Sequence, residues 1–353
     1  MKSLSISILA IEETMVYTLA GPHDIFSSIN LFNKSSQVDK NYFTSSTHIV
    51  GPRKGLITCY NGLAINCQKS LEEVNHTDLI IIPSLELLDE PILHKYPKLK
   101  NWLINHYRQG ATIACICLGS FLLAETGLLD HKICTTHWAF TQRMQATFPT
   151  LEIHSDKIIT EQNNLICSGG ATSWQDLTSY LLKKFTNAEK TREINNFFLL
   201  NSHEDGQTPF TDLLNISVAN DLVIQKTCDW INNNLNNPDL LRTSIQLSAL
   251  TERTYKRRFK QATGLSPLEY IQNIRIEHAK KQLENTQKNI QTISEEINYT
   301  DGSYFRRLFK RKTGMTAQTY RKRFSTVNPA KKKKKKEISK EIREKSKNAY
   351  KEH

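Results

Sequence analysis

Short apolar segments alternate with helical patterns along the first 200 residues of the chain. The expected strands lie at 4–11, 78–84, 111–117 and 165–168, and the expected helices lie at 22–32, 99–110, 120–129 and 172–185. Strands that are apolar on both faces and separated by helices are typical of a parallel sheet covered on each side. The pattern therefore predicts a doubly wound, mostly parallel, flavodoxin-like α/β domain over residues 1–200.

The second half of the chain has helical periodicity and contains a repeat. RRFKQATGL at 257–265 returns as RLFKRKTGM at 307–315, and a repeat indicates one structural unit used twice. In each copy, residues at helical spacing divide into an apolar face and a polar, mainly basic face. The apolar faces are Tyr255, Phe259 and Ala262, then Phe305, Leu308 and Phe309; the polar faces are Arg253, Lys256, Arg257 and Lys260, then Ser303, Arg306, Arg307 and Lys310.

Signals at the ends of the repeats predict where helices stop and start. Gly264 and Gly314 close the two copies, and glycine suits the left-handed conformation that ends a helix. Ser266, Pro267 and Glu269 follow the first copy and combine a serine cap, a first-position proline and a capping box. We expect a connecting helix from Ser266 to about Glu284, and an all-α domain of two helix-turn-helix units over 220–325.

Charge is distributed unevenly along the chain. Residues 1–200 hold 17 Lys and Arg against 18 Asp and Glu, whereas residues 201–353 hold 30 against 17. The excess of positive charge indicates that only the second half meets a polyanion such as double-stranded DNA. The end of the chain, 326–353, is rich in lysine and almost without apolar residues, so we expect a disordered tail.

Composition excludes several classes of protein. No apolar segment approaches the length that spans a bilayer, so no membrane partner is expected. The seven cysteines are scattered and form no CxxC pair, which favours a reducing, cytoplasmic environment without structural disulfides. We expect no metal site and no cofactor.

The segment ACICLGSFLLAETGLL carries the clearest chemical signal of the first half. An expected strand runs directly into an expected helix, with Cys117 at the junction and Gly119 two residues later. A sharp strand-to-helix turn presents its side chain above the sheet, where a helix N-terminus stabilises a thiolate. Cys117 is therefore either a nucleophilic or oxidisable cysteine, or a small buried residue at a tight turn.

Several motifs of the first half resemble the ThiJ/PfpI branch of the class I glutamine amidotransferase-like superfamily, and in particular the sensor domain of GlxA-type regulators. They are GPHDIF, IIPS, ICLGSFLLAETGLL, TTHW and CSGGATSWQDL, and DGQTPF at 205–210 is similar to the signature preceding that group's DNA-binding domain. The resemblance places Cys117 at the nucleophile position. Ligands of open α/β sheets bind at the carboxyl ends of the strands, so we expect a ligand site near Cys117 that includes Cys117, Leu118, Gly119, His137, Gly169 and Gly170.

Two departures from the catalytic pattern argue against an enzyme. Leu118 stands where enzymatic members carry histidine, and Thr18 stands where many carry an acidic residue. Without a neighbouring base or acid, a cysteine loses the usual means of general acid–base chemistry. The resemblance therefore implies a non-catalytic domain that senses a small ligand, dimerises, or both.

Residues 220–324 resemble the AraC/XylS family of transcription regulators, whose domain joins two helix-turn-helix units by a long helix. The resemblance places Arg253, Lys256 and Arg257, and then Gly302, Ser303, Tyr304, Arg306 and Arg307, at positions that read DNA. Three departures concern local structure: Ser244-Ile245 in the first supporting helix, Ala249 and Asn298 where glycine is usual in the turns, and Ala317 in place of proline.

Together these features predict a cytoplasmic, sequence-specific transcription regulator that is not an enzyme. The expected organisation is a sensor domain at 1–200, a linker at 201–219, the DNA-binding domain at 220–325 and the tail at 326–353. The expected partners are double-stranded DNA, an unidentified small effector, a second copy of the chain and RNA polymerase. The alternatives are a cysteine-dependent hydrolase or amidase, or a redox sensor using Cys117, fused to a DNA-binding domain.

Overall fold

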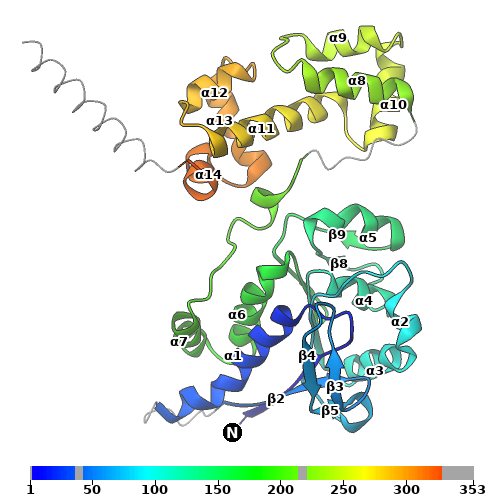
Figure 1. Ribbon diagram of the computed structural model, residues 1–353, viewed down its shortest axis with the longest axis vertical. Helices are drawn as coiled ribbons and strands as arrows, with labels where there is room; N and C mark the ends of the chain where they lie inside the picture. Colours follow the sequence, from blue (N-terminus) through cyan, green and yellow to red (C-terminus); the bar gives the residue numbers. More distant parts are fainter. Residues whose placement is uncertain (1, 36–42, 214–220, 328–353) are drawn as a thin grey trace, which may run out of the picture. The chain divides into compact units, whose positions relative to one another are not determined.

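A computed structural model describes residues 2–35, 43–213 and 221–327 (Figure 1). The chain divides into two compact units, Met1–Thr211 and Asp212–His353. Apart from residues 326 and 327, the expected lysine-rich tail lies outside the described residues. Among the described residues, no helix is long and apolar enough to cross a membrane, and no group of three or more His, Cys, Asp or Glu side chains is arranged to hold a metal ion.

The first unit is built on a seven-stranded sheet in the order β10-β11-β7-β6-β1-β2-β5. Only β10 and β11 pair antiparallel; the other neighbours are parallel, which confirms the predicted α/β fold. The strands are β1 (Lys2–Leu9), β2 (Phe43–Gly51), β5 (Lys69–Ser70), β6 (Leu79–Ile82), β7 (Thr112–Ile116), β10 (Ile159–Gln162) and β11 (Leu165–Ser168). Two smaller sheets pair β3 (Gly55–Thr58) with β4 (Ala64–Cys67), and β8 (Ile133–Cys134) with β9 (Glu152–Ile153).

Both faces of the sheet are covered, because successive residues of its inner strands enter two different cores. Ile80 and Ile82 of β6 pack into one core, whereas Leu79 and Ile81 pack into the other. One face carries α2 (Ile92–Lys95), α3 (Pro97–Arg108) and α4 (Gly119–Glu125), and the other carries α1 (Val16–Ser35), α6 (Trp174–Phe185) and α7 (Ala188–Phe198) (Figure 1). The short α5 (Thr141–Thr147) lies next to β8 and β9 (Figure 1).

The first helix begins earlier than the sequence pattern predicted. Pro22 was expected to open a helix, but it lies inside α1, where a proline removes one backbone hydrogen bond. The neighbouring Gly21 allows α1 to approach α6 closely, since a Cβ at that position would come within 2.7 Å of the Trp174 ring. The expected start of the helix at Pro22 is therefore corrected to Val16.

The predicted linker is also shorter than expected. Residues 201–211 belong to the first unit, and the Gln207 side chain in this segment is almost completely buried. Gln207 forms hydrogen bonds with the loops that follow β8 and β11. The polar composition of 201–211 suggested a linker because the sequence does not reveal these long-range partners.

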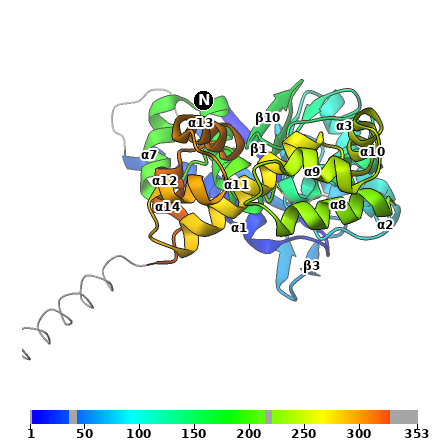
Figure 2. The same cartoon turned by 90° about the horizontal axis from the view of Figure 1, so that it is seen from above.

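The second unit consists of helices arranged around one central helix, α11 (Pro267–Asn285) (Figure 2). The others are α8 (Leu222–Asn233), α9 (Leu240–Leu247), α10 (Glu252–Thr263), α12 (Ile290–Glu296), α13 (Gly302–Thr313) and α14 (Ala317–Phe324). The first half of α11 contributes Tyr270 and Ile274 to a core with α8–α10. Its second half contributes Ala279 and Leu283 to a core with α12–α14. The all-α fold is thus as predicted.

The expected helix ends in this unit are confirmed. Gly264 and Gly314 close α10 and α13 with φ of 76° and 78°. Ser266 caps α11 and forms the capping box with Glu269. The next helix, α14, starts at Ala317 with Thr316 as its cap, so the missing proline leaves this boundary unchanged.

The two departures from glycine in the turns generate a stability prediction. Ala249 and Asn298 both have positive φ, 53° and 64°, a conformation that costs most side chains about 1–2 kcal/mol but that asparagine tolerates. Ala249→Gly should therefore raise the free energy of unfolding by about 0.5–1 kcal/mol after the entropy cost of glycine. Asn298→Gly is the matched control and should change it little. Urea unfolding followed by circular dichroism measures both, and equal effects would contradict the strain at Ala249.

Candidate functional site

Cys117 lies at the strand-to-helix turn, but its thiol is enclosed. Its φ is 54°, and its backbone N–H donates to the carbonyl oxygen of Ser168 at 2.9 Å. The residue is only 2% exposed, and burial raises the pKa of the thiol to about 11. The turn therefore has the shape of a nucleophile elbow while its side chain stays protonated at neutral pH.

The residues around this turn are used for packing. Thr18, at the position where an acid would be expected, donates its hydroxyl to Met15 O at 2.7 Å and accepts from Ser84 N at 3.0 Å. Leu118 packs against the cores on both sides of the sheet. Gly119 is required for close approach, because a Cβ there would lie 2.4 Å from the carbonyl oxygen of Pro83.

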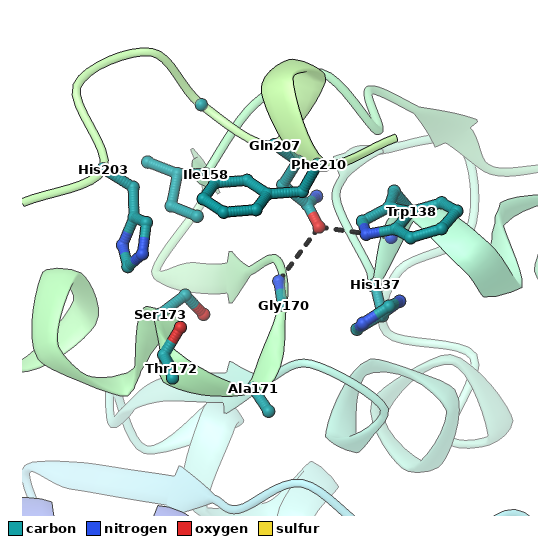
Figure 3. A pocket seen from close by; sticks show the side chains of 11 residues that line it. His137, Trp138, Ile158, Gly170, Ala171, Thr172, Ser173, His203, Gln207 and Phe210 are labelled. Atoms are coloured by element: carbon teal, nitrogen blue, oxygen red, sulfur yellow. Dashed lines mark hydrogen bonds between the residues drawn. The ribbon is translucent and has the colours of Figure 1, made fainter. Parts of the chain in front are cut away.

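A cavity of about 190 Å³ opens in the first unit, near the loops that hydrogen-bond with the Cys117 backbone through Thr136 and Ser168. Two of the residues predicted for the ligand site, His137 and Gly170, line it, whereas Cys117, Leu118, Gly119 and Gly169 are not among its lining residues. Figure 3 shows His203 and the Phe210 ring on one side of the pocket and His137 and Trp138 on the other. The complete lining is His137, Trp138, Ile158, Gly170, Ala171, Thr172, Ser173, His203, Gly206, Gln207 and Phe210.

One wall of the cavity comes from the segment preceding the second unit, and its central residue is Gln207. The Oε1 atom of Gln207 accepts from Trp138 N at 3.1 Å and from Gly170 N at 2.9 Å (Figure 3). The Nε2 atom donates to Thr136 O at 2.8 Å and to Ser155 O at 3.0 Å. The motif DGQTPF was identified from the sequence as a signature that precedes the DNA-binding domain, but Gln207 was not predicted as a site residue.

The two histidines of the cavity have fixed hydrogen-bond partners. His137 Nδ1 accepts from Ala139 N at 3.1 Å, so the ring proton of the neutral form is on Nε2. Burial lowers the pKa of His137, which favours this neutral form. The carboxylate of Asp176 accepts hydrogen bonds from the backbone N–H and from the ring Nδ1 of His203, both at 2.7 Å. These bonds anchor the start of the segment that forms this wall of the cavity.

The basic faces predicted for the second unit lie on α10 and α13. All of the predicted side chains of these faces are exposed, and the opposite faces are buried in the two cores. In the described part of the chain, Arg257 and Arg307 form no ion pair, whereas Lys256 pairs with Glu252 at 2.5 Å. Two chemically similar helices thus present unpaired guanidinium groups.

Other polar residues next to these faces have structural partners. Tyr304 accepts a hydrogen bond from Gln272 of α11 at 3.2 Å, and Arg306 donates to Ser303 at 3.1 Å. Arg258 belongs to the basic run of α10, but it makes two hydrogen bonds, of 2.8 and 2.7 Å, with Asp221 at the start of α8. Asp221 is distant from Arg258 in the sequence and is brought next to it by the fold. The sequence alone therefore does not show that Arg258 is paired while Arg257 is free to contact DNA.

Two families match the chain over separate ranges. Residues 17–184 match the DJ-1/PfpI family, and residues 246–323 match a helix-turn-helix domain. The chain joins a DJ-1/PfpI domain to an AraC-type helix-turn-helix domain. The second unit is accordingly a DNA-binding domain, as the repeat indicated.

Individual relatives match this chain over different shares of its length. The HTH-type transcriptional regulator CdhR of Pseudomonas aeruginosa is 24% identical over 74% of this chain and 77% of its own length. The HTH-type transcriptional activator RhaR of Yersinia pseudotuberculosis is 42% identical over 23% of this chain and 29% of its own. The crystal structure of Drosophila melanogaster DJ-1beta covers 57% of this chain and all of its own, with 18% identity and a TM-score of 0.48.

The enclosure of Cys117 generates a prediction about its reactivity. A thiol pKa of about 11 instead of the ordinary 9.0 leaves roughly a hundredfold less thiolate at neutral pH. Iodoacetamide should therefore alkylate Cys117 at least about a hundredfold more slowly than free cysteine. Mass spectrometry of the labelled peptide measures this rate, with urea-unfolded protein as the control. If Cys117 reacts faster than the other six cysteines, the redox-sensor alternative is supported instead.

Proposed function

We propose that this protein is a ligand-responsive, sequence-specific transcription regulator whose first unit senses a small molecule without catalysing a reaction. The observation that carries the proposal is the duplication of one exposed basic face on α10 and α13. Arginine and lysine read guanine edges and contact phosphates. Two such helices in one chain fit two successive short segments of a DNA site.

The unpaired state of Arg257 and Arg307 supports direct base reading. An arginine that is already paired with a carboxylate would have to exchange that partner for DNA. Among the described residues, Arg257 and Arg307 have no carboxylate partner, and their side chains are exposed to solvent. Lys256 and Arg306 have partners within their own helices, which suits residues that position the helix or contact phosphates. Ser303 and Tyr304 complete the reading face of α13. The shared helix α11 packs with α10 in one core and with α13 in the other.

A non-catalytic role for the first unit is supported by the chemistry around Cys117. The thiol is buried and protonated, Thr18 serves as a hydrogen-bonding link between α1 and the end of β6, and Leu118 supplies no base. The cavity beside His137 and Gly170 is the place where we propose that the effector binds. The regulator is proposed to act as a homodimer, and its DNA-bound form to contact RNA polymerase.

The base-reading proposal predicts separable effects of the two arginines. In a bound complex, Arg257→Ala should weaken binding by about 1–3 kcal/mol and relax sequence preference in one segment of the site, because a bidentate contact to guanine is lost. Arg307→Ala should do the same in the other segment. The site is first selected from a random duplex library with the full-length protein, and then titrated with each base pair varied.

Arg192→Ala in the first unit is the control, because it removes the same charge from an exposed position outside the DNA-binding domain. If both reading-helix variants lose affinity equally for every DNA sequence, Arg257 and Arg307 contact phosphates and do not read bases. If the wild-type protein selects no sequence at all, the proposed function itself is wrong.

The effector proposal predicts a binding site that a single bulky side chain closes. Ala171 lines the cavity, so Ala171→Phe should fill much of its volume of about 190 Å³. Small metabolites that raise the melting temperature of the wild-type protein should no longer do so in this variant, because their stabilisation depends on binding the folded state. Cys117→Ser is the matched comparison and should leave these shifts intact; loss of the shifts in Cys117→Ser alone would place the effector at the elbow.

A further inference from the structure

The segment from His203 to Leu213, which we name the strap, joins the cavity to the DNA-binding unit. Its beginning is fixed by Asp176, which accepts from both the backbone and the ring of His203. Gly206 makes the turn before Gln207: its φ is 67°, and a Cβ there would lie 2.3 Å from the carbonyl oxygen of Asp156. Four strap residues, His203, Gly206, Gln207 and Phe210, line the cavity.

The side chain of Gln207 occupies a socket that is chemically specific for a carboxamide. Its oxygen receives two backbone N–H groups, from Trp138 and Gly170. Its nitrogen faces only acceptors: the carbonyl oxygens of Thr136, Ser155 and Lys157 at 2.8, 3.0 and 3.2 Å, and the hydroxyl of Thr135 at 3.3 Å. A carboxylate would direct an unprotonated oxygen at these acceptors, so the socket distinguishes glutamine from glutamate.

The socket is also shaped to the glutamine side chain. Gln207 is 2% exposed, and a Cβ on Gly169 would lie 2.3 Å from its Cδ atom. Glycine at position 169 therefore creates the space that the carboxamide fills. The two glycines predicted for a ligand site have this specific role: Gly169 makes room, and Gly170 donates a hydrogen bond.

The far end of the strap is attached to the central helix of the DNA-binding unit. Leu213 N donates to Glu277 Oε1 on α11 at 3.1 Å, and Asn273 Nδ2 donates to Leu213 O at 3.5 Å. Glu277 is itself buried and paired with Lys280 at 2.7 Å. The Leu213 side chain packs against the core formed by α11–α14. Only six positions separate Leu213 from Gln207 in the sequence.

We propose that the strap is the coupling element of the regulator: occupancy of the cavity and attachment of Leu213 to α11 are linked through the docking of Gln207. This inference rests on the proposed function and names its means of regulation. A small molecule in the cavity contacts His203, Gln207 and Phe210 only while the strap is docked. Such a molecule stabilises the docked state, since a ligand shifts a population toward the state that it binds better.

The decisive variant is Gln207→Glu in the full-length protein, with Gln109→Glu as its control. Both change an amide to a carboxylate in the first unit, but Gln109 is exposed at the end of α3. In Gln207→Glu, backbone amides of residues 203–211 should exchange hydrogen about tenfold faster or more, because the docked strap opens locally. Peptides from α11 should also exchange faster, and affinity for the selected DNA site should fall about fivefold or more. Gln109→Glu should change none of these quantities.

Chemical rescue tests the socket without depending on the effector. In Gln207→Ala the socket is left open, so acetamide should restore slow exchange of the Gly170 N–H, whereas acetate, its carboxylate counterpart, should not. Hydrogen exchange is measured at equal concentrations of the two compounds, and wild-type protein should respond to neither. Equal rescue by acetate would overturn the carboxamide specificity of the socket.

The outcomes separate this inference from the proposed function. If wild-type protein selects a DNA site but Gln207→Glu binds it as tightly as Gln109→Glu does, the coupling through the strap is wrong while the regulator assignment stands. If the strap amides of Gln207→Glu stay protected, the socket does not hold the strap. If strap and α11 peptides both lose protection and DNA affinity falls, with circular dichroism unchanged, the proposal is supported.

Discussion

A polar group that is buried without a partner is costly, and much of the first unit follows from this constraint. The loops after β8, β9 and β11 leave backbone N–H and carbonyl groups in the interior. Trp138, Gly170, Thr136 and Ser155 find their partner in one side chain, Gln207, from a segment outside the sheet. At the elbow, the backbone of Ser84 is likewise satisfied by the hydroxyl of Thr18. In both places, backbone polar groups are satisfied by a side chain that is distant in the sequence.

The general fold was predictable because it depends on patterns that are local in the sequence. Continuous apolar strands indicated a sheet covered on both faces, and Ile80, Leu79 and their neighbours divide between two cores as this requires. The basic faces of α10 and α13 followed from helical spacing, and Gly264, Ser266 and Gly314 act as the helix boundaries that their chemistry indicates.

The sites were less predictable because they depend on residues distant in sequence. His137 and Gly170 do line a cavity, but whether Cys117 would be open or enclosed depends on packing from both faces of the sheet. Gln207 lies 37 positions from the Gly170 amide that it binds, and no local pattern connects them. Arg258 and Arg257 are adjacent and chemically identical, yet Asp221 holds the first and leaves the second exposed. The start of α1 was predicted wrongly, because Pro22 is a common helix-start signal and here lies inside the helix.

The division of α11 between two cores imposes a rule of helical phase on the chain. Each residue along an α-helix turns it by roughly 100° and lengthens it by about 1.5 Å. A single residue inserted near Ile274 or Ile276, where the contacts pass from one core to the other, would rotate Ala279 and Leu283 out of their core relative to Tyr270. The reading helices would then lose their common orientation even though every one of their own residues were unchanged. An insertion or deletion of even one residue in α11 would therefore disturb the domain, whereas substitutions on the exposed surface of this helix would not change its phase.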